Sequence, residues 1–305
     1  MTLYERVFPK WQKDKRFRVF GDESGPGVSL TWLGTASFVV RTATTTVLVD
    51  PYVTRLGLPG LLFGHEPDER AIASAFPSVV DAIVCGHSHY DHVADAPRIA
   101  KRTGAVLVGS ESTCAWGEAE GLPKDKLVAM GSRGGVVTVG DVEIRLVPSA
   151  HGKVVLHRVP FPGTVERVSR LPRPVWDYKM GGAFGVLLRV GDLRIYHNGS
   201  ADLVDAELEG ERADVLVAGL AGRRGTENYV ARLLSALDPK VVVPTHHDAF
   251  FAPLERGVHL LPGVDLDGFV SEVGVRAPEA RVITPGYTEW VAVGERGENA
   301  VIPLR

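Results

Sequence analysis

This chain of 305 residues lacks three things: cysteine in quantity, long apolar runs and an excess of charge of one sign. Its two cysteines are too few for a disulfide framework, which fits a reducing compartment such as the cytoplasm. No apolar run is long enough to cross a bilayer, so we expect no integral membrane segment. A formal net charge of -3 gives no reason to expect nucleic acid as a partner. We expect a protein that acts on a small molecule, and the sequence leaves a homo-oligomer open.

What the chain has instead is a concentration of histidine and aspartate just after a predicted buried strand. The sequence GHSHYDH there carries His87, His89, Asp91 and His92 and leads into a segment with helical periodicity. Side chains two apart in an extended segment point the same way, so His87 and His89 can converge on one ion. As the chain turns into the helix, Asp91 and His92 swing to a neighbouring position and can hold a second ion. Imidazole and carboxylate together suit zinc, and also manganese or ferrous iron.

This His-x-His-x-Asp-His pattern resembles the signature of the metallo-β-lactamase superfamily. The resemblance continues upstream in TWLGTASF at 31–38 and VLVDP at 47–51, and downstream in PSAH at 148–151 and PTH at 244–246. Among the branches, the chain is most similar to the group of ascorbate-6-phosphate lactonase and, more distantly, of the phospholipase D that cleaves N-acyl-phosphatidylethanolamine. The resemblance implies an α/β fold, the four-layer αβ/βα sandwich, and one or two bound zinc ions.

The resemblance also implies where the remaining ligands lie. His151 follows a predicted strand between small residues, and it is expected as the third ligand of the ion at the first two histidines of the motif. His246 is expected as the last ligand of the second ion, although periodicity alone does not separate it from His247. The adjacent Asp248 can orient either imidazole. Asp91 is the expected catalytic residue, since its carboxylate can steer a proton of the attacking water.

The resemblance breaks down at Gly199-Ser200, where members of the family usually have Gly-Asp and that aspartate bridges two ions. Two divalent ions bring four positive charges, and without a bridging aspartate only Asp91 and one hydroxide offset them. We therefore expect a weakly held second ion or a single ion, unless Asp202 compensates. Asp50 ends a predicted strand and is expected either to accept a hydrogen bond from a metal-bound histidine or simply to begin a turn.

The chain divides into a basic, aromatic N-terminal arm at 1–27 and one catalytic domain at 28–305. Within that domain, 153–182 is irregular and rich in proline, and its cations outnumber its carboxylates. We expect it to form a lid or a substrate wall that favours an anionic substrate, with a solvated loop as the alternative. Residues expected to contact the substrate are Arg173, Tyr178, Lys179 and His197.

These observations predict a metal-dependent hydrolase. A divalent ion lowers the pKa of bound water to about 7, so an activated water can attack an ester, lactone or phosphodiester bond of a small, anionic substrate. The alternative is a catalytically altered metal-binding protein with a regulatory or partner-binding role, which Ser200 keeps open. A di-iron oxidoreductase would need an electron partner such as a flavin domain, and the sequence indicates none.

Overall fold

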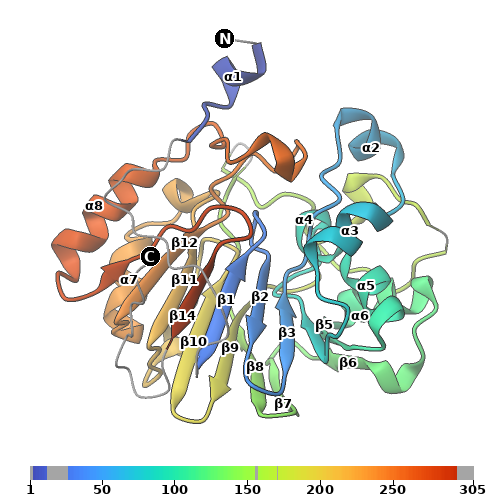
Figure 1. The fold of residues 1–305 in the computed structure, drawn as a ribbon, viewed down its shortest axis with the longest axis horizontal. Coiled ribbons are helices and arrows are strands. Elements are labelled where there is room, and N and C mark those ends of the chain that lie inside the picture. Colours follow the sequence, from blue (N-terminus) through green and yellow to red (C-terminus); the bar gives the residue numbers. More distant parts are fainter. Residues whose placement is uncertain (1–2, 12–26, 155–156, 170, 294–305) are drawn as a thin grey trace.

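Two seven-stranded sheets face each other in the computed structural model, which describes residues 3–11, 27–154, 157–169 and 171–293 (Figure 1). The first sheet has the order β14-β1-β2-β3-β4-β5-β6, and the second has the order β13-β12-β11-β10-β9-β8-β7. The strands of the first sheet are β1 (Val28–Trp32), β2 (Phe38–Arg41), β3 (Thr46–Val49), β4 (Ala82–Val84), β5 (Val106–Ser110), β6 (Leu127–Met130) and β14 (Trp290–Val293). Those of the second are β7 (Gly135–Val139), β8 (Val142–Pro148), β9 (Phe184–Val190), β10 (Leu193–Asn198), β11 (Val215–Gly219), β12 (Val241–Thr245) and β13 (Arg281–Val282).

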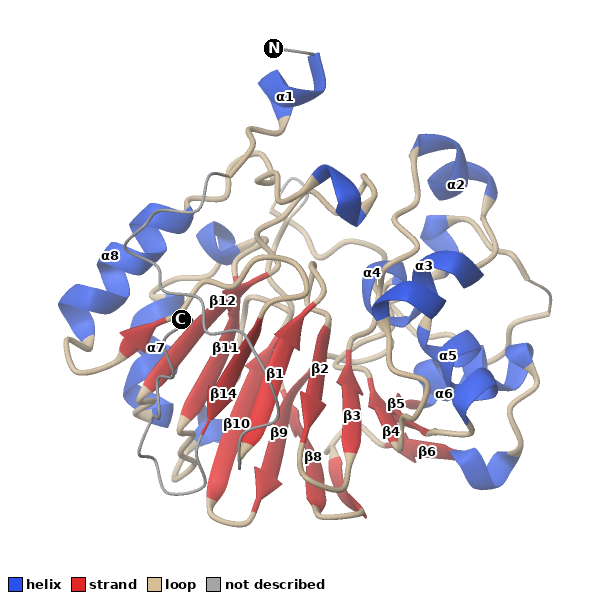
Figure 2. Cartoon of the chain, viewed as in Figure 1, coloured by secondary structure: helices blue, strands red, loops and turns tan. Residues whose placement is uncertain are grey.

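Helices cover the outer face of each sheet (Figure 2). The α-helices are α1 (Leu3–Val7), α2 (Leu58–Phe63), α3 (Glu69–Ala75), α4 (Tyr90–Val93), α5 (Ala96–Thr103), α6 (Glu111–Glu120), α7 (Tyr229–Leu237) and α8 (Leu266–Arg276). Short 3-10 turns are η1 (Lys124–Lys126), η2 (Val175–Asp177), η3 (Asp205–Leu208), η4 (Arg223–Gly225) and η5 (Leu254–Arg256). Helices α3, α5 and α6 pack on the first sheet, and α7 and α8 pack on the second. The predicted four-layer αβ/βα sandwich is confirmed.

Three apolar clusters account for this layering. Strand β1 alternates buried and half-buried residues, because one face meets the opposite sheet. Strands β4, β11 and β12 are instead buried throughout, because helices cover their second face. One cluster fills the space between the sheets, and the other two lie under the two outer helical layers.

The parallel strands bring distant segments to one edge of the sandwich. Strands β3 and β4 run parallel in the first sheet, and β10, β11 and β12 run parallel in the second. Their carboxyl ends are followed by the stretches that carry most of the predicted site residues. The fold therefore assembles a site from loops of both halves, as open α/β sheets do at the carboxyl ends of their strands.

The sequence predicts that the hydroxyl-rich stretch from Ser110 either faces the substrate or caps a helix, and that Thr226 caps another helix. Ser110 accepts a hydrogen bond from the backbone N–H of Thr113 and begins α6, so the hydroxyl-rich stretch after β5 caps a helix. Helix α7 begins at Tyr229 and not at Thr226, because Asn228 has a left-handed φ of 51°. The Thr226 hydroxyl instead donates to the carbonyl of Ala201.

The described part of the N-terminal arm lies against the domain. Its Trp11 N–H donates to the carbonyl of Val258, and the Phe8 ring packs at 6.2 Å from the ring of Phe251. The rest of the predicted arm, at 1–2 and 12–26, lies outside the described residues. No helix that the structure describes combines the length and apolar character needed to cross a membrane.

Candidate metal centre

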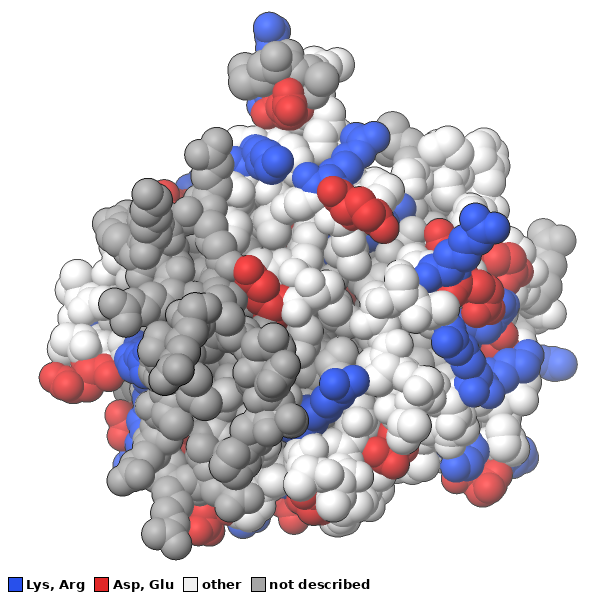
Figure 3. Space-filling model, in the orientation of Figure 1, with Lys and Arg blue, Asp and Glu red and all other residues white. Residues whose placement is uncertain are grey.

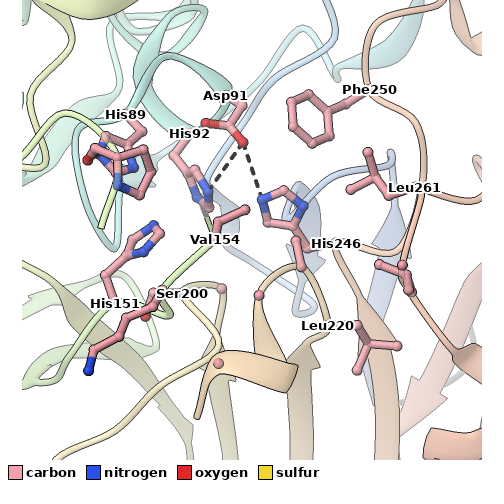
Figure 4. Close-up of a pocket in the computed structure, with 18 of the residues that line it drawn as sticks. His89, Asp91, His92, His151, Val154, Ser200, Leu220, His246, Phe250 and Leu261 are labelled. Atoms are coloured by element: carbon pink, nitrogen blue, oxygen red, sulfur yellow. Dashed lines mark hydrogen bonds and ion pairs between the residues drawn. The ribbon is translucent and has the colours of Figure 1, made fainter. Parts of the chain in front are cut away.

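Three histidines from the two halves of the sandwich converge at the edge described above. His87 and His89 follow β4, and His151 follows β8. Their ring centroids lie 4.7–4.9 Å apart, and one ligand atom from each can be chosen so that all three lie within 4.8 Å of one another. Figure 4 shows His89 and His151 facing the same space. We call His87, His89 and His151 the three-histidine group.

Hydrogen bonds fix which nitrogen is available in two of the three rings, those of His89 and His151. Nε2 of His89 donates to the carbonyl of Pro160 at 2.9 Å, and Nδ1 of His151 donates to the carbonyl of Gly152 at 2.8 Å. Because a carbonyl can only accept, the other nitrogen of each neutral ring carries a free lone pair. Nε2 of His87 is buried and has no hydrogen-bond partner among the described residues. Three unprotonated imidazole nitrogens at one place are what a zinc site requires.

Burial keeps these rings neutral. It lowers the pKa of His89 to about 4 and that of His151 to about 3. Burial, together with the neighbouring imidazoles, also lowers the pKa of His87 well below its usual value. A proton would compete with a metal for each nitrogen, so the low pKa values leave the group ready to bind a cation at neutral pH.

A second group lies beside the first and contains Asp91, His92 and His246. The first two residues belong to α4, and the third follows β12. Oδ2 of Asp91 lies 3.2 Å from Nε2 of His246 and 3.8 Å from Nε2 of His92, as the dashed lines in Figure 4 mark. Burial raises the pKa of Asp91, but the two imidazoles outweigh it and lower the pKa, so the carboxylate is ionised. We call these three residues the aspartate group.

Asp50 lies directly behind the aspartate group. Its Oδ2 is 2.9 Å from Nδ1 of His92, and its Oδ1 accepts the backbone N–H of Gly86 at 2.7 Å. Burial lowers the pKa of His92, but the carboxylates of Asp50 and Asp91 outweigh it and raise the pKa. Because Nδ1 of His92 faces Asp50, its Nε2 is the nitrogen turned toward Asp91. This is the geometry of a carboxylate that orients a metal-binding imidazole.

The structure separates His246 from His247. His246 has a left-handed φ of 52° and points toward Asp91. His247 points away, is fully buried and stacks on Trp32 with ring centroids 4.6 Å apart. His247 therefore contributes to the core and lies outside both groups.

Asp248 supports the backbone that carries His246. Its carboxylate accepts the N–H of Thr35 at 2.7 Å, the Arg55 guanidinium at 2.9 Å and the Tyr287 hydroxyl at 2.7 Å. The carbonyl of Thr35 in turn accepts the N–H of His246 at 2.8 Å. Asp248 thus fixes a turn next to His246 and contacts no imidazole nitrogen, contrary to the predicted orienting role.

Ser200 lines the site, but Asp202 does not. The Ser200 hydroxyl donates to the carbonyl of Ala150 at 2.9 Å and occupies the position after Gly199 where the resemblance expects a bridging aspartate. The Asp202 carboxylate accepts the N–H of Leu203 at 2.8 Å and lies 3.7 Å from the guanidinium of Arg232. It is therefore occupied outside both groups. Among the described residues, Asp91 is the one carboxylate that the two groups contain.

Both groups open into one cavity of about 610 Å³. The predicted lid contributes to its wall near the start of the segment, through Lys153, Val154, His157, Pro160 and Phe161. Apolar residues that the sequence analysis did not assign complete the wall: Leu220, Phe250, Phe251, Leu261, Pro262 and Val264. A signal for two of them was present, since Phe250 and Phe251 lie four and five residues after His246.

None of the four predicted substrate contacts lines this cavity. Arg173 is 2.6 Å from Asp177, with which it forms an ion pair. Tyr178 stacks on Trp116 with ring centroids 3.9 Å apart, and Lys179 offers only its carbonyl to the hydroxyl of Ser88. The fourth residue, His197, is buried behind Asp50: its Nδ1 lies 3.9 Å from Oδ2 of that carboxylate, and its Nε2 donates to a backbone carbonyl. The side chains of Arg173, Tyr178 and His197 are thus committed to interactions elsewhere.

Comparison with known proteins agrees with this architecture. A family described as "Beta-lactamase superfamily domain" matches residues 29–246. A "UPF0173 metal-dependent hydrolase" of Anaeromyxobacter dehalogenans is 32% identical over 230 residues, covering 72% of this chain and 75% of the relative. A protein of the same description from Methanopyrus kandleri is 31% identical over 233 residues, covering 74% of this chain and 86% of the relative.

Solved structures share the fold at low sequence identity. Igni18, a metallo hydrolase from the hyperthermophilic archaeon Ignicoccus hospitalis, has a TM-score of 0.58 at 20% identity, covering 88% of this chain and 99% of that one. CmlA, a diiron β-hydroxylase from Streptomyces venezuelae, has a TM-score of 0.57 at 16% identity, covering 89% of this chain and 55% of that one. The extent of the family match and of the sequence relatives shows that the chain belongs to the metallo-β-lactamase superfamily, among its metal-dependent hydrolases.

Proposed function

We propose that this protein is a zinc-dependent hydrolase that cleaves an ester, lactone or phosphodiester bond of a small, anionic substrate. The observation that carries the proposal is the three-histidine group, where three imidazoles with depressed pKa values meet at the floor of a cavity. The lactone is included because the sequence resembles the lactonase branch. We place the protein in the cytoplasm, which the two free and buried cysteines support.

A divalent ion, when bound, lowers the pKa of water to about 7 and polarises the group under attack. The residues of the chain supply the rest. His87, His89 and His151 present neutral imidazoles, and hydrogen bonds to backbone carbonyls orient two of them, His89 and His151. Asp91 is ionised and borders the cavity, so its Oδ2 can accept a proton from the attacking water. No serine or cysteine nucleophile is needed.

We further propose that the two groups hold a metal unequally. The three-histidine group is electrically neutral, and the aspartate group brings one negative charge. Ser200 donates its hydroxyl proton to a backbone carbonyl and adds no charge between them. Two divalent ions would face an excess of positive charge, so the second ion binds weakly or the enzyme works with one.

The test is hydrolysis of chromogenic esters, lactones and phosphodiesters by the full chain loaded with zinc, manganese or iron. We expect activity on at least one class, and we expect His87→Ala to abolish it together with metal binding. His65→Ala is the matched control, because His65 lies outside the cavity, and it should change neither. Activity that survives His87→Ala would refute the proposed site. Metal binding without hydrolysis of any class would favour a metal-binding protein with a regulatory or partner-binding role.

A further inference from the structure

The cavity is apolar at one end. Figure 4 shows Phe250 and Leu261 on the far side of His246 from His89 and His151. Phe250 is largely buried and Leu261 is half-buried, so both present hydrocarbon to the cavity with little freedom to move away. A substrate that places only polar atoms there would leave them without partners, which is costly. This end therefore fits an alkyl or aryl group.

A cation among the lining residues lies close in sequence to the three-histidine group. Lys153 lies two residues after His151, is exposed, and is one of the residues that line the cavity. Its backbone runs beside η4, since a Cβ added to Gly225 would lie 2.7 Å from the Lys153 carbonyl oxygen. No carboxylate among the described residues forms an ion pair with Lys153. Its charge is therefore available to a ligand in the cavity.

The second cation of the cavity differs from the first. Arg224 also lines the cavity, but its guanidinium lies 3.9 Å from the carboxylate of Asp265. Asp91 is the one acidic residue that lines the cavity, within the described residues. Charges of both signs intermix elsewhere on the described surface visible in Figure 3, so that face shows no broader field of one sign.

From this polarity we propose that the substrate is amphiphilic. Its anionic group lies at Lys153, on the side of the three-histidine group, and its apolar group lies along Phe250 and Leu261, beyond His246. The bond to be cleaved then falls between the two ends, over the metal-binding groups. This inference rests on the proposed hydrolase function and narrows its substrate to an ester or phosphodiester with an alkyl or aryl arm on one side and a carboxylate, phosphate or sulfonate on the other.

Binding of non-hydrolysable probes tests this inference separately from catalysis. Butane-, hexane- and octanesulfonate, and the alcohols of the same lengths, are titrated calorimetrically into the zinc-loaded full chain. Sulfonates coordinate metals poorly, and the Lys153→Gln variant separates the attraction of Lys153 from that of the ion. We expect each added methylene to tighten binding by about threefold to fourfold. We also expect each sulfonate to bind more tightly than its alcohol.

Variants test which residues bind the anionic and the apolar end of the probes. Lys153→Gln should weaken the sulfonates about twofold to fivefold and leave the alcohols unchanged. Leu261→Ala should reduce the dependence on chain length for both series, and because the side chain is half-buried the fold should tolerate it. Lys179→Gln is the control in the same segment, outside the cavity, and should change nothing.

Several outcomes overturn the inference: absence of sulfonate binding, affinity that does not depend on chain length, or a Lys153→Gln variant that binds every probe as the wild type does. The proposed function fails on different grounds. If the protein binds the probes as expected but hydrolyses no substrate, the amphiphilic cavity is supported and the hydrolase function is refuted. If the protein hydrolyses short neutral esters with no preference for chain length or charge, the hydrolase function is supported and the amphiphilic substrate is refuted.

Discussion

Replacement of Asp50 by asparagine tests the orientation of His92 most directly. In the wild type, one carboxylate oxygen is 2.9 Å from Nδ1 of His92 and the other accepts the N–H of Gly86. In Asp50→Asn, the amide oxygen can keep the Gly86 contact, but the amide N–H₂ then faces the imidazole. To avoid two opposed donors, His92 must carry its proton on Nε2, the nitrogen turned toward the aspartate group.

General energetics give the size of the effect by two routes. A hydrogen bond to a charged group contributes about 1.5–3 kcal/mol, which corresponds to about 10- to 150-fold in affinity. Loss of a carboxylate that supports a ligating histidine typically lowers metal affinity by about 10- to 100-fold. We therefore expect Asp50→Asn to weaken metal binding at the aspartate group by one to two orders of magnitude. The three-histidine group should change by less than about threefold, because its orienting partners are backbone carbonyls.

Zinc titration against a chromophoric chelator measures both binding steps. Asp202→Asn is the control, since Asp202 lies outside both groups and faces Arg232. We expect the wild type and the control to give the same curve, and we expect Asp50→Asn to weaken one binding step selectively, the step at the aspartate group. An unchanged curve for Asp50→Asn would refute the orienting role. Equal weakening of both steps would show a general disturbance of the edge instead.

Three further predictions concern charge and burial. Ser200→Asp should tighten binding of the second ion at least tenfold, because it adds a carboxylate to the site. Metal analysis after dialysis should then find two ions per chain. One ion per chain would contradict the charge argument. Arg55→Met should lower the free energy of unfolding, measured in urea, by about 3–5 kcal/mol, because it leaves the Asp248 carboxylate buried without its ion-pair partner. Adding Asp248→Asn to this variant should recover part of the loss. No recovery would count against the ion pair as the cause. Burial lowers the pKa of His247 to about 4 in the folded chain. As the pH falls below about 6.5, the unfolded chain therefore binds a proton at this residue that the folded chain does not yet bind, and this favours unfolding. The stability of the wild type should therefore fall by up to about 3 kcal/mol more than that of His247→Phe between pH 7 and pH 4, and parallel pH profiles would refute this.

The layers and the histidine motif were predictable because both depend on short-range patterns. Alternating burial marks the half-buried strand β1, and the spacing of His87 and His89 follows from the two-residue repeat of extended chain. The four-layer arrangement itself was predicted through the resemblance to the metallo-β-lactamase superfamily, which rests on the motifs and their order along the chain. The choice between His246 and His247 did need it, because a left-handed φ and the stacking on Trp32 decide it.

The walls of the cavity were less accessible to sequence reasoning. The cations of 153–182 predicted an anion site, but composition does not tell which way a side chain points in an irregular segment. Arg173 is neutralised by Asp177 four residues on, and Tyr178 packs on Trp116 from a different part of the chain. The apolar end depends on residues after β11 and β12, which the fold alone brings beside the histidines.

The two ligand groups contain residues from both halves of the sandwich, so a bound cation would also hold the halves together. His87, His89, Asp91 and His92 follow a strand of the first sheet, while His151 and His246 follow strands of the second. Neither half alone offers a complete set, so high affinity can arise only after the halves have docked. A bound ion would then link the two halves, and it would bind late in folding. Removing it with a chelator should weaken the contact between the halves before either sheet unfolds.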